Sequence, residues 1–129
     1  MNNFEFVCKK RFNEINNNLY MYKHSSGLSL YYYPNMTSNS FSVVTRIKEN
    51  DTSEVFHILE HMLCRGNKDN KYFDLATFFK KIQSTKFRAT TNFSNIFFQF
   101  ENKDINEYFG LANILLDNVF NPSLLKEDF

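Results

Sequence analysis

The chain has 129 residues and a formal net charge of +1, with 43% hydrophobic and 18% aromatic residues. A chain of this length folds as one domain or part of one, and its apolar content excludes an intrinsically disordered protein. The balance of 15 basic and 14 acidic residues gives no field of one sign, so nucleic acid and anionic membranes are not expected partners.

The amino-terminal segment and the cysteines bear on the cellular compartment. The first seven residues lack the cationic start and apolar run of a signal peptide, and no apolar run approaches the roughly 20 residues that span a bilayer. Cys8 and Cys64 form neither a disulfide framework nor a C-x-x-C pair. We therefore expect no membrane association and, by default, a reducing cytoplasmic location.

The first part of the chain is predicted to be mostly strand. Residues 4–18 have mixed character and fit either an extended arm or a short helix. Two β-rich runs, 19–24 and 28–33, flank a short turn that contains Gly27, which is the pattern of a hairpin. Residues 41–47 are enriched in β-branched side chains and predict a further strand.

A helix is predicted over residues 54–64, where Thr52 or Ser53 can cap its start and Gly66 can end it. Its apolar residues recur at helical spacing, namely Val55, Ile58, Leu59, Met62 and Leu63.

The remaining elements complete an α+β pattern. An amphipathic helix at 72–82, strands at 86–91 and 96–100, and a helix at 104–120 that Pro122 closes are predicted. Strands and helices therefore do not alternate regularly. This order predicts an α+β fold, with helices packed on one face of a largely antiparallel sheet.

Two of the three histidines, His57 and His61, lie four residues apart on the predicted helix. This spacing places both imidazoles on one helix face, one turn apart, where both can bind one zinc ion. Glu60 points to the same side and can take a proton from a zinc-bound water, whose pKa the metal lowers to about 7. The string His-x-x-Glu-His is the inverted zincin signature. Two helical histidines also occur as surface residues or as satisfied core groups, so the motif alone leaves both interpretations open.

The surroundings of the motif resemble a known family. The stretch from Phe56 to Gly66 closely resembles the active helix of the pitrilysin and insulinase family, in which a small apolar run and a glycine follow the inverted motif. The likeness continues in residues 4–30, which resemble the start of the presequence protease branch, and in the segments 41–46 and 104–122. It covers most of the chain at low identity.

The resemblance implies a fold, a function and a set of site residues. It implies a single partial α+β domain over residues 1–129, carrying the zinc helix of a zinc-dependent endopeptidase that cleaves short unfolded peptides. By the same resemblance, His57 and His61 bind Zn²⁺ and Glu60 is the general base. It also implies a substrate-facing edge strand at 91–100, where a peptide pairs by β-augmentation. The expected substrate-binding residues there are Ile96, Phe97, Phe98 and Gln99.

The chain departs from the family pattern at three places. Residues 53–56 lack the glycine that usually precedes the first histidine, and Arg88 stands where the family has the asparagine of an Asn-Ala pair. The family's third zinc ligand is a glutamate on a later helix, and the surroundings of Glu127 do not match it. We therefore expect the chain alone to be inactive, with the remainder of the enzyme as its partner.

A non-catalytic alternative stays open at this point: a degenerate remnant or protein-interaction module of the same fold. Cys64, three residues after His61, could form a His-Cys metal pair, although a small buried thiol is the commoner role of such a residue. His24 is expected to be a strand residue without a special role.

Overall fold

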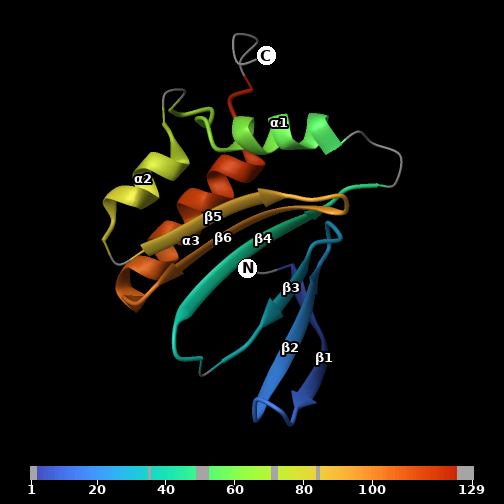
Figure 1. Cartoon of the computed structure of the whole chain (residues 1–129). Coiled ribbons are helices and arrows are strands. Elements are labelled where there is room, and N and C mark those ends of the chain that lie inside the picture. The colour runs from blue at the N-terminus through green and yellow to red at the C-terminus, as the bar shows by residue number, and fades with distance from the viewer. Residues whose placement is uncertain (1–2, 35, 49–52, 71–72, 84, 125–129) are drawn as a thin grey trace. The chain divides into compact units, whose positions relative to one another are not determined.

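The computed structural model describes residues 3–34, 36–48, 53–70, 73–83 and 85–124 (Figure 1). Its contacts divide the chain into two compact units, Met1–Thr37 and Ser38–Phe129. The sequence predicted one partial domain over the whole length. Within the described ranges, no helix combines the length and apolar character that crossing a membrane requires.

The first unit is a three-stranded antiparallel sheet of β1 (Phe4–Phe12), β2 (Asn17–His24) and β3 (Ser29–Tyr32), in the order β1-β2-β3. The predicted hairpin is confirmed as β2 and β3, and Gly27 in its turn adopts φ +93°, a left-handed conformation that glycine accepts without strain. Within the opening segment 4–18, which the sequence left undecided, residues 4–12 form β1, whose pairing with β2 has one irregularity between Phe6 and Cys8.

The second unit is built on an antiparallel sheet of β4 (Asn39–Arg46), β5 (Thr85–Thr91) and β6 (Asn95–Asn102). The order is β4-β6-β5, so β6 is the central strand. This corrects the expectation that residues 96–100 form an edge strand, because both sides of β6 are already hydrogen-bonded to neighbours. Among the described residues the edge strand on this side is β5.

Three helices lie on one face of this sheet (Figure 1): α1 (Ser53–Leu63), α2 (Leu75–Lys81) and α3 (Ile105–Phe120). The α+β class with helices on one sheet face is confirmed. Helix α2 is shorter than predicted because Asp74 caps it, accepting a hydrogen bond from the Thr77 amide at 2.6 Å. The predicted start of that helix, Tyr72, and the predicted caps of α1, Thr52 and the Ser53 side chain, lie outside the described residues.

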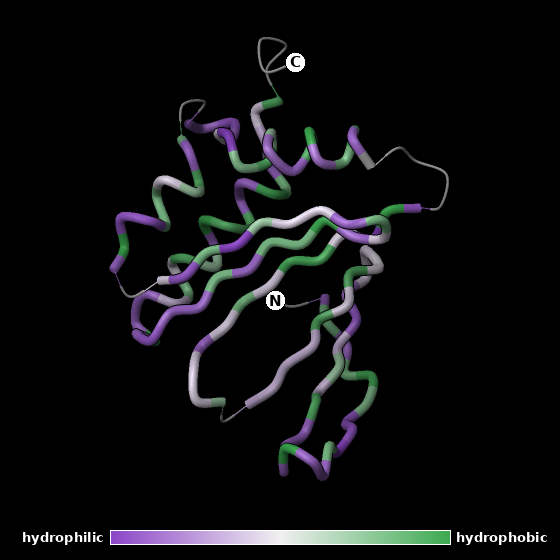
Figure 2. Tube along the Cα trace, viewed as in Figure 1, coloured by the Kyte–Doolittle hydropathy of each residue, from purple (hydrophilic) through white to green (hydrophobic). Residues whose placement is uncertain are grey.

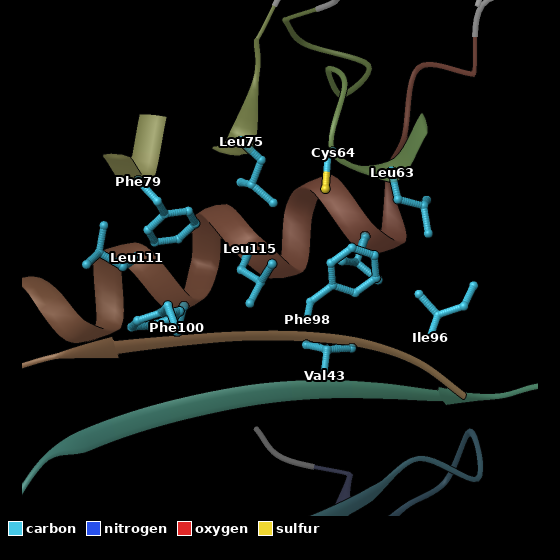
Figure 3. Packing of buried hydrophobic residues seen from close by; sticks show 12 residues of the cluster. Val43, Leu63, Cys64, Leu75, Phe79, Ile96, Phe98, Phe100, Leu111 and Leu115 are labelled. Carbon is cyan, nitrogen blue, oxygen red and sulfur yellow. The ribbon is translucent and has the colours of Figure 1, made fainter. Parts of the chain in front are cut away.

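The core lies between the sheet and the helices. Along β6 every second residue is buried, and Phe98 and Phe100 are fully enclosed under Leu115 and Leu111 of α3 (Figure 3). Phe79 of α2 extends this packing by stacking on Phe100, with the ring centroids 5.4 Å apart. Strands β4 and β6 are rich in hydrophobic residues, green in Figure 2. Those that point toward the helices form the buried face of the sheet.

The carboxyl end of α1 is fixed by buried polar contacts. Asn118 of α3 has no exposed surface, and its Nδ2 donates to the Leu63 carbonyl at 3.4 Å. Its Oδ1 accepts from Asn67 Nδ2 at 3.1 Å. Gly66, predicted to end the helix, lies three residues beyond its last residue, Leu63, and adopts the left-handed conformation at φ +77°. These contacts hold α1, and therefore its histidines, against the rest of the unit.

The buried face of β6 gives a stability prediction. Phe98→Ala is expected to lower the free energy of unfolding by about 3–5 kcal/mol, because it leaves a large cavity in a fully buried site. The matched control is Phe93→Ala, because Phe93 is 92% exposed and its change should stay within about 0.5 kcal/mol. Chemical denaturation followed by circular dichroism measures both. Equal losses for the two variants would contradict the core described here.

Candidate metal centre

The two histidines of α1 converge on one point in space. Their Nε2 atoms are 3.1 Å apart, their ring centroids are 4.7 Å apart, and both side chains are exposed. A tetrahedral zinc ion with Zn–N distances of about 2.0–2.1 Å separates two ligand nitrogens by about 3.3 Å. The predicted convergence of His57 and His61 on one helix face is therefore confirmed. The same distance also suits an N–H···N hydrogen bond between neutral rings.

The histidine pair fits two positions of a zinc site and leaves the others open. Across the described ranges, no group of three or more His, Cys, Asp or Glu side chains is placed to hold a metal ion. Glu127, the last glutamate of the chain, lies outside the described residues. The donor chemistry of His57 and His61 suits zinc, since neutral imidazole is one of its preferred ligands.

Glu60 stands between the two histidines in sequence but is buried, with 6% of its surface exposed. Its Oε2 accepts a hydrogen bond of 2.6 Å from the Thr91 hydroxyl at the end of β5. Thr91 Oγ1 also lies 3.5 Å from the Phe56 carbonyl, one turn earlier on α1. A carboxylate tied in this way keeps a fixed orientation, which a general base requires.

Sequence reasoning did not single out Thr91. The alternation along β5 was the signal that could have found it, because Phe87, Ala89 and Thr91 are spaced two apart on the face that meets the helices. Phe87 and Ala89 pack against the core, and Thr91 reaches α1.

A groove lies beside the motif. It has a volume of about 530 Å³ and is bounded by α1, the start of α2 and strand β5. Glu60 and His61 line it on the helix side, and residues 87–90 line it on the strand side. Strand β5 is an edge strand of this sheet among the described residues, and its residues 87–90 line the groove. The groove therefore combines the motif with a strand edge that an extended chain can pair with.

The residues expected to bind substrate do not line this groove. Ile96 and Phe98 are buried in the core at 1% and 0% exposure, and Phe97 and Gln99 lie on the opposite face of β6. Although β6 contacts α1, both of its edges are paired, so an added peptide strand has no place there. Of the two edge strands that the described residues form in this sheet, β4 and β5, it is β5 that lines the groove.

The other candidate ligands have structural surroundings. Cys64 is buried at 9% exposure, and this burial, together with the charges of Glu60 and Asp74, raises the pKa of its thiol to about 12. A thiol that stays protonated is a poor metal ligand, because the thiolate is the form that binds. His24 lies in the first unit, where its Nδ1 is 2.7 Å from the Ser26 hydroxyl.

Comparisons with known proteins place this geometry in context. No family model matches the chain. It is 31% identical over 99 residues to the mitochondrial presequence protease of Candida albicans and 33% identical over 96 residues to that of Xenopus tropicalis, matches that cover 74% and 72% of this chain. The crystal structure of pitrilysin superposes with a TM-score of 0.81 over 98% of this chain, at 18% identity. The chain belongs to the pitrilysin/insulinase family.

The chain spans only a small part of its pitrilysin/insulinase relatives. It corresponds to 9% of the two presequence proteases and 14% of the pitrilysin chain. An uncharacterized protein of Borreliella burgdorferi is 27% identical over 98% of this chain, which is 13% of that protein. The peptidase activity of a whole family member is therefore not established for this chain.

The Thr91–Glu60 hydrogen bond gives a prediction of its own. Thr91→Val is expected to lower the free energy of unfolding by about 1–3 kcal/mol, because it leaves the buried Glu60 carboxylate without its hydroxyl donor. Thr91→Ser keeps the hydroxyl and serves as the matched control, which should lose clearly less. Urea titrations of both variants measure the difference. A Thr91→Val protein as stable as Thr91→Ser would show that the hydrogen bond contributes nothing.

Proposed function

We propose that this chain supplies the zinc-binding helix and the substrate-pairing strand of a zinc metalloendopeptidase. The observation that carries the proposal is the convergence of the two His Nε2 atoms, 3.1 Å apart, next to a carboxylate that Thr91 holds in place. The groove beside them, bordered by an edge strand, supports a peptide as the substrate.

Each residue of the motif has a distinct role in this proposal. His57 and His61 bind the metal through Nε2 as neutral imidazoles. A bound zinc ion supplies a Lewis acid that polarises a carbonyl and lowers the pKa of a water ligand to about 7. Glu60 receives and passes on the proton at its carboxylate. Thr91 engages Oε2, so Oε1 is the oxygen assigned to proton transfer. Thr91 is a positioning residue, because it acts through Glu60.

The substrate class follows from the edge of β5. An added strand needs unpaired backbone N–H and C=O groups on itself, which folded proteins offer mainly at strand edges and unfolded peptides offer throughout. We infer that short unfolded peptides bind along residues 87–90, within the groove that Glu60 and His61 also line. The remainder of a longer family member is the proposed partner that completes the chamber and the ligand set.

A non-catalytic module of the same fold is the competing function. The observation that favours it is the ligand count, because the described residues bring together two metal ligands and a catalytic zinc site takes three from the protein. Two measurements separate the candidates, one of metal binding and one of turnover.

Zinc binding should depend on the histidine pair. His57→Ala and His61→Ala are each expected to weaken zinc binding more than tenfold, since each removes a direct ligand and loss of an outer-shell partner alone costs about 10–100-fold. Competition with a fluorescent zinc chelator measures the affinity. His24→Ala is the matched control, because His24 is the third histidine and lies on β2 in the first unit. If His24→Ala weakened zinc binding as much as the other two variants, the site would be misplaced.

The chain alone is expected to show little or no peptidase activity. Two imidazoles hold the metal weakly, and the walls that orient a peptide, which can supply about 7–11 kcal/mol of barrier reduction, are assigned to the proposed partner. The assay is zinc-loaded chain with a quenched unstructured peptide. Robust turnover that disappears in Glu60→Gln would show that the chain carries a complete site, with Glu127 the first residue to test as third ligand.

A further inference from the structure

Arg88 lies in the middle of the edge strand and has no charged residue opposite it. Arg88 is exposed and is one of the residues that line the groove beside Glu60 and His61, and its side chain leaves the sheet on the face opposite the helices, as that of Gln99 does. Its cross-strand partner on β6 is Gln99, whose amide nitrogen donates to the Ser40 hydroxyl at 2.8 Å. The neighbouring strand therefore offers Arg88 a neutral side chain that is already engaged elsewhere.

The acidic groups of the groove are occupied within the fold, whereas its arginines face solvent. Glu60 is buried and accepts from Thr91, and Asp74 caps α2 by accepting from the Thr77 amide. Arg65 and Arg88 are both exposed and both line the groove. A peptide strand paired along β5 thus runs beside two exposed arginines, whereas the two carboxylates are already used by the fold. This arrangement favours an anionic group on the ligand.

We propose that Arg88 is a specificity-determining residue that selects an acidic side chain in a peptide paired along β5. The proposal rests on the function proposed above, because it takes the groove as the peptide site. In a paired strand, the residue opposite Arg88 brings its Cβ to about 4.5–5.5 Å, within reach of a guanidinium–carboxylate contact. The preferred peptide therefore carries Asp or Glu opposite Arg88, next to residues whose side chains turn toward α1.

Lys86 provides a matched control on the same strand. It is exposed and lies two residues before Arg88, so both side chains leave the same face of the sheet. Unlike Arg88, it stands opposite a carboxylate, because its cross-strand partner is Glu101. It is also outside the groove lining. Removing the Lys86 charge should thus leave the preference for acidic peptides almost unchanged.

The test measures peptide binding rather than turnover. Extended peptides with blocked ends, identical except for Glu, Gln or Lys at one central position, are titrated into the metal-free chain, and amide shifts of β5 are followed by NMR. The Glu peptide should bind about fivefold more tightly than the Gln peptide, and the Lys peptide more weakly than either. Blocked ends remove the terminal carboxylate as a source of the effect.

Arg88→Gln should bring the ratio of Glu-peptide to Gln-peptide affinity to about one, and Arg88→Glu should reverse the preference in favour of the Lys peptide. Lys86→Gln should keep the wild-type ratio.

Three outcomes would overturn the proposal: equal binding of the Glu and Gln peptides by the wild-type chain, a preference that persists in Arg88→Gln, or no peptide-dependent shifts on β5. Because metal is absent, the result is independent of the histidines. A chain that fails to bind zinc but selects acidic peptides through Arg88 would refute the catalytic proposal and leave the selectivity standing. The amide spectra of the variants also report whether each one folds.

Discussion

The packing of one face of β6 under α3 is the constraint on which the rest of the second unit depends. Phe98 and Phe100 are buried on that face, and the two flanking strands supply the residues that complete it, with Val43 opposite Phe98 on β4 and Phe87 opposite Phe100 on β5. Once β6 is central, β5 must be at the edge, and α1 meets the sheet there. The groove, the position of Thr91 and the place of Arg88 all follow from this order.

Local patterns in the sequence predicted much of the fold. Helical spacing located α1 and α3, and the turn with Gly27 located the first hairpin, because these signals depend on residues a few positions apart. The error concerned which strand lies at the edge. The position of β6 depends on the pairing of Val43 with Phe98, which are 55 residues apart (98 − 43). An alternating apolar pattern is the same in a central strand and in an edge strand, so the sequence does not distinguish them. The helix predicted from residue 72 begins at Leu75, because Asp74 caps it. The apolar residues before Asp74 fit the helical spacing and led to the earlier predicted start.

The candidate site also has a part that local sequence predicts and a part that depends on the tertiary fold. The histidine pair is a property of one helix, so four-residue spacing was enough to predict that the two nitrogens converge. The surroundings of Glu60 are tertiary, since Thr91 is 31 residues away and reaches the carboxylate only after the sheet has formed. Arg88 departs from the family pattern in sequence, but its position beside the groove follows only from the strand order. The convergence of the two histidines was thus predictable from the sequence, whereas the surroundings of Glu60 and the lining of the groove were not.

The buried contact between Asn118 and the Leu63 carbonyl sets an order of events during synthesis. The two residues are 55 positions apart, so at about 5–20 residues per second the end of α1 is made roughly 3 to 11 s before Asn118 exists. During that interval the motif helix has neither this anchor nor the face of α3 that covers β6. The histidines can meet a metal ion early, but the framework that holds them in register is completed only after α3 has left the ribosome. Completion of the framework around the histidine pair is therefore coupled to the synthesis of α3 rather than to the translation of the motif itself.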